Sequence, residues 1–186
     1  MKRKILVVDN ETGAMKDIKE SLKGEEIKII HFEKFKLEQA EGFTHIILTG
    51  GDYWVNLRKF SEEVKLIRNS QTPILGICYG MQLIAKSFES DLKILKKLNK
   101  GNTDVKILKE NELFEKIPKE IKVFEYRQYA INNLGKNLKI LAESEYGIEV
   151  IKHKTKKIWG VQFHPEVIFE NQKVGRKIIK NFLRIK

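Results

Sequence analysis

The stretch Pro73-Ile-Leu-Gly-Ile-Cys-Tyr-Gly-Met-Gln82 decides the fold of this chain. Residues 73–77 form an apolar run without alternation, which is typical of a strand that is covered on both faces. The run passes directly into Gly76-Ile-Cys-Tyr-Gly80, and a helical pattern of apolar residues begins at once with Met81. The sequence therefore predicts a sharp strand–turn–helix elbow with Cys78 at its apex.

Cys78 has the surroundings of a nucleophile. Gly76 and Gly80 stand two residues before and after it, and a turn this tight leaves no room for larger side chains there. An elbow holds its nucleophile in a strained conformation at the carboxyl edge of the sheet, where α/β proteins bind ligands. The start of a helix also stabilises a thiolate. A buried structural role is commoner for a lone cysteine, but the flanking glycines favour the nucleophile.

The first half of the chain alternates strand and helix patterns, which argues for a parallel sheet in an α/β domain. Amphipathic helices are indicated between Ala14 and Leu22, with Gly24 as the C-cap, and between Leu57 and Ile67. The expected strands are residues 4–8, 27–32, 45–49 and 73–77.

The second half shows short β-like runs between Gly, Asn and charged turns, and we expect antiparallel additions to the same sheet or a small side sheet. A closing helix is indicated by apolar residues from Val174 to Phe182. We predict one domain over residues 1–186, an α/β fold with a mixed, mostly parallel sheet flanked by helices. The expected second-half strands are residues 104–108, 121–124, 139–142, 148–152 and 158–161.

Composition excludes several classes of protein. A single cysteine excludes an intrachain disulfide framework and a zinc site built from several thiolates of this chain. No apolar run approaches the roughly 20 residues of a membrane span, and the run after the basic N-terminus is too short for a signal peptide. We expect a soluble, cytoplasmic protein. The net charge of +11 fits either a nucleic-acid binder or a solvated Lys- and Glu-rich surface.

A second constellation lies in Ile158-Trp-Gly-Val-Gln-Phe-His-Pro-Glu-Val167. In an extended backbone His164 and Glu166 point to the same side, and Pro165 stiffens the link between them. A cysteine nucleophile needs a base, and the base needs an orienting group. His164 and Glu166 are the candidates for these two roles.

The remaining histidines do not suggest a metal site. His31 and His45 lie in strand patterns and are expected to pack or to cap, while His153 lies in a charged turn that we expect to be exposed. Scattered histidines without a carboxylate cluster argue against bound metal.

Paired glycines follow the third expected strand, as Thr49-Gly50-Gly51. They would end near the same sheet edge, where a glycine backbone can approach a ligand closely. With the Tyr79 N–H they could form an oxyanion hole. The chain has no phosphate-cradling glycine motif, so we expect no ATP or dinucleotide bound through such a motif.

Together, in this order, the three segments resemble the class I (triad-type) glutamine amidotransferases. The resemblance spans most of the chain and implies a flavodoxin-like fold and a triad of Cys78, His164 and Glu166. It also implies oxyanion N–H groups from Gly51 and Tyr79, and substrate contacts from Gly50 and Gln82. It implies no metal or cofactor in this chain.

Within the family, the motif around Cys78 and the C-terminal run look most like the GMP synthase type, in the form of a free-standing glutaminase subunit. That implies glutamine as substrate and a synthase partner of the ATP-pyrophosphatase type, which would carry ATP and magnesium. Two stretches depart from the family pattern: Asp52-Tyr53-Trp54 after the paired glycines, and Phe124–Ala130 where a Ser-His-x-Asp-like segment is expected.

Other functions remain open at this point. An amidotransferase for a different acceptor fits the same motifs, and a cysteine-dependent α/β hydrolase could share the elbow. A non-catalytic relative is less consistent with the Cys, His and Glu of this chain. A nucleic-acid binder rests on charge alone, so we expect neither a nucleic-acid nor a membrane partner.

Overall fold

The computed structural model describes residues 2–168 and 173–186. The described strands form one sheet in the order β2-β1-β3-β4-β9-β8-β7-β5-β6. These strands are β1 (Lys4–Asp9), β2 (Glu26–His31), β3 (His45–Leu48), β4 (Ile74–Ile77), β5 (Asp91–Ile107), β6 (Glu120–Asn133), β7 (Leu138–Ser144), β8 (Gly147–His153) and β9 (Ile158–Val161). The helices are α1 (Met15–Ser21), α2 (Ser61–Asn69), α3 (Tyr79–Ser87) and α4 (Val174–Phe182), with 3-10 turns η1 (Phe32–Lys34), η2 (Leu37–Ala40) and η3 (Glu112–Phe114).

The sheet has a parallel half and an antiparallel half. From β2 to β9 neighbouring strands pair parallel, and from β9 to β6 they pair antiparallel. The mixed sheet flanked by helices is confirmed, but its antiparallel part is as wide as its parallel part, so the expectation that the sheet is mostly parallel was wrong. Strand β4 lies between β3 and β9, so the elbow at its carboxyl end sits near the middle of the sheet.

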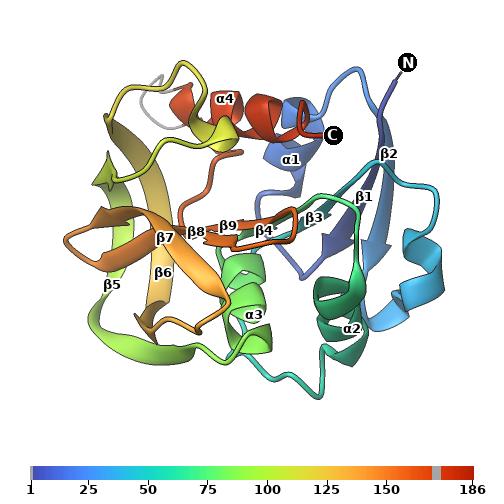
Figure 1. The fold of residues 1–186 in the computed structure, drawn as a ribbon, viewed down its shortest axis with the longest axis horizontal. Helices are drawn as coiled ribbons and strands as arrows, with labels where there is room; N and C mark the ends of the chain where they lie inside the picture. Colours follow the sequence, from blue (N-terminus) through green and yellow to red (C-terminus); the bar gives the residue numbers. More distant parts are fainter. Residues whose placement is uncertain (1, 169–172) are drawn as a thin grey trace.

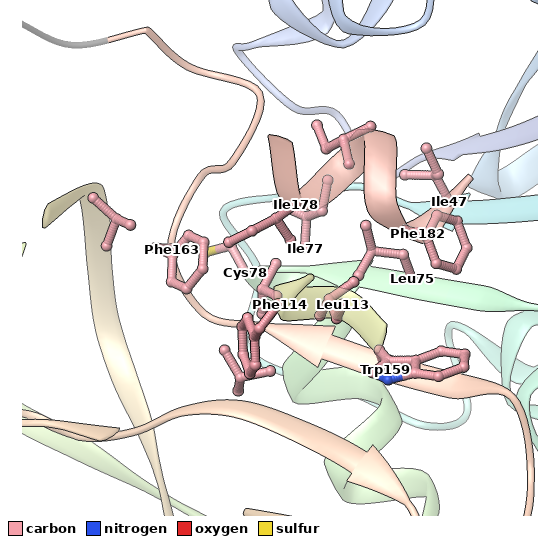
Figure 2. Packing of buried hydrophobic residues seen from close by; sticks show 14 of the residues in the cluster. Ile47, Leu75, Ile77, Cys78, Leu113, Phe114, Trp159, Phe163, Ile178 and Phe182 are labelled. Atoms are coloured by element: carbon pink, nitrogen blue, oxygen red, sulfur yellow. The ribbon is translucent and has the colours of Figure 1, made fainter. Parts of the chain in front are cut away.

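Helices cover both faces of the parallel half, with α1 and α4 on one face and α2 and α3 on the other (Figure 1). Side chains of β1 alternate between these layers: Ile5 and Val7 join the cluster beneath α1 and α4, and Leu6 and Val8 join the other. Because each strand is buried on both faces, its sequence reads as a continuous apolar run. Cys78 belongs to the cluster beneath α4, where it lies between Phe163 and Ile77 (Figure 2).

The elements expected in the first half are present, with ends that differ by a few residues. Helix α2 begins at Ser61, after a turn that contains Leu57, so the apolar residue at 57 precedes the helix. Helix α1 has Leu22 as its C-cap, and Gly24 follows with a φ of +98°. The expectation that Gly24 itself is the cap was therefore wrong by two residues.

The second half extends the same sheet with longer strands than expected. The stretch 91–103 belongs to β5, although its exposed lysines and the irregular pairing between Ile94 and Asn99 hide the alternation. Strand β6 continues past residue 124, where the expected strand ended. The prediction stopped there because buried polar residues interrupt the apolar pattern. The strand at 158–161 is present as β9, but it pairs parallel with β4 as well as antiparallel with β8, so the expectation of antiparallel pairing alone was wrong. In the described ranges, no helix combines the length and apolar character of a membrane span.

Candidate active site

The turn between β4 and α3 holds Cys78 in a strained conformation, as the sequence predicted. Its φ of 49° and ψ of −103° lie outside the regions that non-glycine residues usually adopt. Such strain persists only where the surrounding structure enforces it. The residue is 6% exposed and lines two adjoining cavities, so it is held in place and still faces open space.

The glycines of the elbow are required by sterics. A Cβ added to Gly76 would stand 2.5 Å from the backbone of Gly80, and one added to Gly80 would stand 2.4 Å from the carbonyl oxygen of Leu48. Both distances are far below van der Waals contact with backbone atoms that cannot move away. The predicted reason for glycine two residues on either side of Cys78 is confirmed.

His164 and Glu166 are brought together on the loop after β9. The His164 Nδ1 lies 2.9 Å from Oε1 of Glu166, whose side chain is fully buried. The loop is anchored at both residues: the His164 N–H donates to the Phe124 carbonyl at 2.9 Å, and the Glu166 carbonyl accepts from Arg176 Nε at 3.3 Å. With Nδ1 occupied by the carboxylate, Nε2 is the ring nitrogen left for a proton transfer.

The electrostatic surroundings of His164 favour its charged form. Burial alone would lower its pKa, but the charges of Glu166 and Cys78, and hydrogen bonds to both, outweigh burial and raise the pKa well above its ordinary value. The charged form of His164 is therefore favoured beside the Cys78 sulfur. The arrangement suits a thiolate–imidazolium pair ready for nucleophilic attack.

The paired glycines lie directly against this pair. A Cβ at Gly50 would stand 3.2 Å from the His164 ring carbon Cε1 and 3.6 Å from the Cys78 Cβ. A Cβ at Gly51 would stand 2.2 Å from the Asn10 carbonyl oxygen, so no other residue fits there without a backbone shift. The expected convergence of this turn with the elbow is therefore present.

Tyr79 and Gln82 occupy the first turn of α3. Tyr79 is the first residue of the helix, where a backbone N–H has no partner within the helix. The Gln82 side chain is buried and donates from Nε2 to Gln162 Oε1 at 3.3 Å. It also lines the same cavity as Cys78, which places its amide within the pocket wall.

Two adjoining cavities flank the Cys78 side chain. One has a volume of about 240 Å³ and the other about 170 Å³, and both are lined by Gly51, Asp52, Cys78 and Tyr126. The larger cavity also reaches Gln82 on α3. The stretch that departs from the family pattern at 124–130 contributes to its wall, as expected for a segment near the site mouth.

Two groups in contact with Cys78 were missed in the sequence. Gln162 Nε2 lies 3.6 Å from the Cys78 Sγ, and the Tyr126 carbonyl oxygen lies 3.8 Å from it. The signal for Gln162 was its place two residues before His164, directly after β9, although the chain bends at residues 162–163. Nothing in the sequence alone pairs Tyr126 with the elbow.

Behind Tyr126, β6 buries a charged cluster. Arg127 Nε lies 2.7 Å from Glu125 Oε2, and its Nη2 donates to Glu149 Oε1 at 2.5 Å; all three side chains are fully buried. Ser144 and Asn99 add hydrogen bonds to the two carboxyl groups. Burial, and then the hydrogen bond and charge of Glu149, raise the pKa of Glu125 and favour its protonated form.

The other histidines have structural roles. His31 caps η1, and His45 is buried and contacts the Ile185 carbonyl oxygen. His153 is also buried, with Nδ1 accepting backbone N–H groups of its turn and its ring against Phe88, so the expected exposure was wrong. Within residues 2–168 and 173–186 no group of His, Cys, Asp and Glu has the arrangement of a metal site.

Comparisons with known proteins identify relatives of this chain. The family model for glutamine amidotransferase class-I matches residues 6–185. The glutamine-hydrolysing GMP synthase subunit from Methanocaldococcus jannaschii is 34% identical, with 97% of this chain and 96% of that protein aligned. The corresponding GMP synthase subunit from Pyrococcus abyssi is also 34% identical, over 97% of each chain.

Solved structures give the same picture of the fold. A candidate GMP synthase subunit from Thermoplasma acidophilum superposes with a TM-score of 0.90 at 32% identity, over 99% of this chain and 94% of that one. A glutamine amidotransferase from Thermotoga maritima superposes with a TM-score of 0.80 at 21% identity, over 99% and 97% of the two chains. The second likeness concerns the fold alone.

Proposed function

The chain belongs to the glutamine amidotransferase class-I family, and from that premise we propose that Cys78, His164 and Glu166 hydrolyse glutamine for a synthase partner. The observation that carries the proposal is a strained cysteine at a cavity, beside a histidine whose Nδ1 is held 2.9 Å from a buried carboxylate. A nucleophile, a base and an orienting group in this arrangement are what acyl transfer requires.

The first half of the reaction forms a thioester. The Cys78 thiolate attacks the side-chain carboxamide carbon of glutamine, and a C–S bond forms while the carbonyl electrons move to oxygen. His164 donates its proton to the amide nitrogen, the C–N bond breaks, and ammonia leaves. The second half hydrolyses the thioester. Neutral His164 takes a proton from a water molecule as that water attacks the thioester carbon. The C–S bond breaks, and glutamate and the Cys78 thiolate are released.

The N–H groups of Gly51 and Tyr79 stabilise the oxyanion in this scheme. One stands on the glycine turn after β3 and the other at the start of α3, on the two segments that meet at the Cys78 side chain. Gly50 lets the turn pass close to His164, and Gln82 contributes an amide from the cavity wall to the bound glutamine. Loss of one such oxyanion donor typically costs about 10²–10³ in rate.

Ammonia released here needs an acceptor close by, and we propose that a synthase subunit of the ATP-pyrophosphatase type supplies it in the cytoplasm. The names of the relatives support GMP as the final product. We propose that ATP and magnesium belong to that partner and that this chain itself needs no cofactor. The charges around α4 and the C-terminus are then a solvated surface, and we propose no nucleic-acid or membrane partner.

An ammonia-transfer assay tests this proposal. The chain is mixed with the synthase subunit from the same source, ATP, magnesium and the nucleotide acceptor, and GMP formation is followed with glutamine as the nitrogen source. We expect glutamine to replace ammonium salts only when both proteins are present. If glutamine is hydrolysed but GMP never forms with a synthase subunit that is active on ammonium, the acceptor assignment is wrong.

An amidotransferase for a different acceptor remains the second candidate, because the mouth of the site departs from the family pattern. Trp54 and Tyr129, one from each departing stretch, pack edge to face with ring centroids 4.9 Å apart. The two departures therefore form one structure at the mouth. Where GMP does not form, recovery of the native partner from a cell extract, followed by the same assay with that partner's acceptor, distinguishes this candidate.

The surface around the mouth has the character of a docking site for the synthase. The cavity is lined by Leu98, Tyr126 and Tyr129, and Trp54 packs on Tyr129. Three of these side chains are exposed: Trp54, Leu98 and Tyr126. Exposed apolar groups of this kind at a functional mouth mark interaction sites. Strand β5, which carries Leu98, also exposes four lysines, Lys93, Lys96, Lys97 and Lys100, and the Lys100 Nζ lies 5.4 Å from the centre of the Tyr126 ring. We propose that this rim receives an acidic face of the synthase subunit.

Charge reversal on the rim tests the docking site. Replacing Lys96 and Lys97 together by glutamate is expected to weaken synthase binding about tenfold or more at low salt, because an acidic partner face would now be repelled. Glutamine hydrolysis by the isolated chain is expected to stay unchanged. Titration of the synthase by a binding assay gives the affinity. The same exchange at Lys23 and Lys28 is the matched control, because Lys28 lies in β2, at the opposite edge of the sheet, and Lys23 lies in the turn before it. Equal losses of affinity for the synthase in both double variants would contradict the assignment.

A further inference from the structure

A buried polar pair lies beneath the glycine turn of the site. Asn10 follows β1, Glu63 projects from α2, and both are shielded from solvent. The Asn10 backbone N–H donates to Thr49 Oγ1 at 2.9 Å, and its side-chain Nδ2 donates to the Thr49 carbonyl at 3.2 Å. The backbone carbonyl oxygen of Asn10 lies so close to Gly51 that a Cβ added to Gly51 would be 2.2 Å from it. Asn10 therefore holds the turn at both ends.

Asn10 is in turn held by Glu63. Asn10 Nδ2 also donates to Glu63 Oε1 at 3.2 Å. The other oxygen of each group, Asn10 Oδ1 and Glu63 Oε2, has no hydrogen-bond partner among the residues that the structure describes. Both are acceptors when Glu63 is ionised, so they cannot satisfy each other. A proton on Glu63 converts Oε2–H into a donor, and an acid and an amide can then pair through two hydrogen bonds. An ionised Glu63 would leave both oxygens buried without a hydrogen bond, which costs more free energy than the paired arrangement.

We propose that Glu63 is a positioning residue that carries a proton at the working pH and donates it in a hydrogen bond to Asn10 Oδ1. Through Asn10 it holds the Thr49–Gly51 turn where the Gly51 N–H meets the oxyanion. Glu63 touches neither substrate nor nucleophile in this role. The inference rests on the function proposed above, because it assigns Glu63 to the support of one of its oxyanion donors.

The electrostatics of the pair agree with a protonated acid. Burial raises the pKa of Glu63 to about 8, while the Asn10 hydrogen bond acts in the opposite direction. The titratable group that faces it from α3 is the Tyr79 hydroxyl, and β1 and β3 present the neutral Asn10 and Thr49. Burial, and then the charge of Glu63, raise the pKa of Tyr79, so Tyr79 stays neutral. Above about pH 8 Glu63 therefore ionises alone, loses its donor and places a negative charge beneath the oxyanion site.

Kinetics of glutamine hydrolysis by the complex with its synthase test this role. E63Q keeps one donor and one acceptor in the same places, and its kcat at pH 7 is expected to stay within about threefold of the parent. E63A leaves Asn10 unpaired, and its kcat is expected to fall about 10- to 100-fold with a smaller change in KM, because the loss falls on the transition state. The parent kcat should decline as pH rises through about 8, and the decline should move to higher pH in E63Q.

Glu62 provides the matched control, since it is the neighbouring glutamate but turns outward to Lys65 and the Leu37 N–H. E62Q should keep the parent pH profile. The inference is overturned if E63Q loses as much activity as E63A, or if E63Q keeps the alkaline decline of the parent. Its failure is separable from failure of the proposed function: if C78A retained hydrolysis the triad itself would fall, whatever the Glu63 variants did.

Discussion

Replacement of Cys78 by alanine is expected to lower glutamine hydrolysis at least about 10⁴-fold, measured with the synthase partner present. The side chain supplies the nucleophile that attacks the glutamine carboxamide and displaces ammonia in the proposed scheme, and no second cysteine exists in the chain. The Gly51 and Tyr79 N–H groups would remain, but without a nucleophile they stabilise a species that no longer forms. Release of glutamate, followed by a coupled assay, gives the rate.

The same variant carries its own control for folding. Synthesis driven by ammonium salts should continue in the complex, because the synthase does not need the thiol for that reaction. S87A serves as the matched exchange: Ser87 lies at the other end of α3, where its Oγ donates to the Leu83 carbonyl, so the hydrolysis rate should not change. Hydrolysis that persists in C78A would remove Cys78 from the mechanism.

Replacement of Arg127 by alanine is expected to lower the free energy of unfolding by about 3–5 kcal/mol. The guanidinium contacts Glu125 and Glu149 where neither side chain reaches solvent, so its removal leaves buried carboxyl groups without their cation. E125Q should cost far less, because burial already favours the protonated form of Glu125. Urea denaturation followed by circular dichroism measures each change.

The matched control lies on the same strand. Lys122 of β6 pairs with Asp104 at 3.3 Å on the surface, and K122A should change the free energy of unfolding by no more than about 0.5 kcal/mol. Combining R127A with E149Q should recover part of the loss, since the second change removes the unpaired charge. An R127A protein as stable as K122A would mean that water or a shift of the strand solvates the two carboxyl groups.

Much of the fold could be predicted because local patterns determine it. The apolar runs of β1, β3 and β4 are short, continuous and bounded by turns, and the elbow follows from glycines whose added Cβ atoms would strike backbone. The antiparallel half was less predictable. Strand β5 exposes lysines along a stretch that carries a register shift, and β6 buries charges, so neither shows a clean alternation of apolar and polar residues.

The candidate site divides in the same way. The sequence placed His164 beside Glu166 on the assumption of an extended backbone, whereas residues 164–167 form a turn closed by the Val167 N–H and the His164 carbonyl, and this turn brings the two side chains together. Glu63 also left a signal, because it stands three residues after Phe60 and four before Ile67 on the buried face of α2. Arg127 left none: its partner Glu149 lies 22 residues away, and only the completed sheet brings the two together. His153 was misjudged because charged neighbours suggested exposure, whereas its ring packs on Phe88.

The most direct measurement of the central claim is covalent trapping of the nucleophile. An electrophilic glutamine analogue is incubated with the complex, and the intact mass and peptide masses of this chain are determined. We predict one adduct per chain, carried by the peptide that contains Cys78, formed more slowly when glutamine is added in excess, and absent in C78A. An adduct on any other residue, or rapid glutamine hydrolysis with Cys78 unlabelled, would contradict the account.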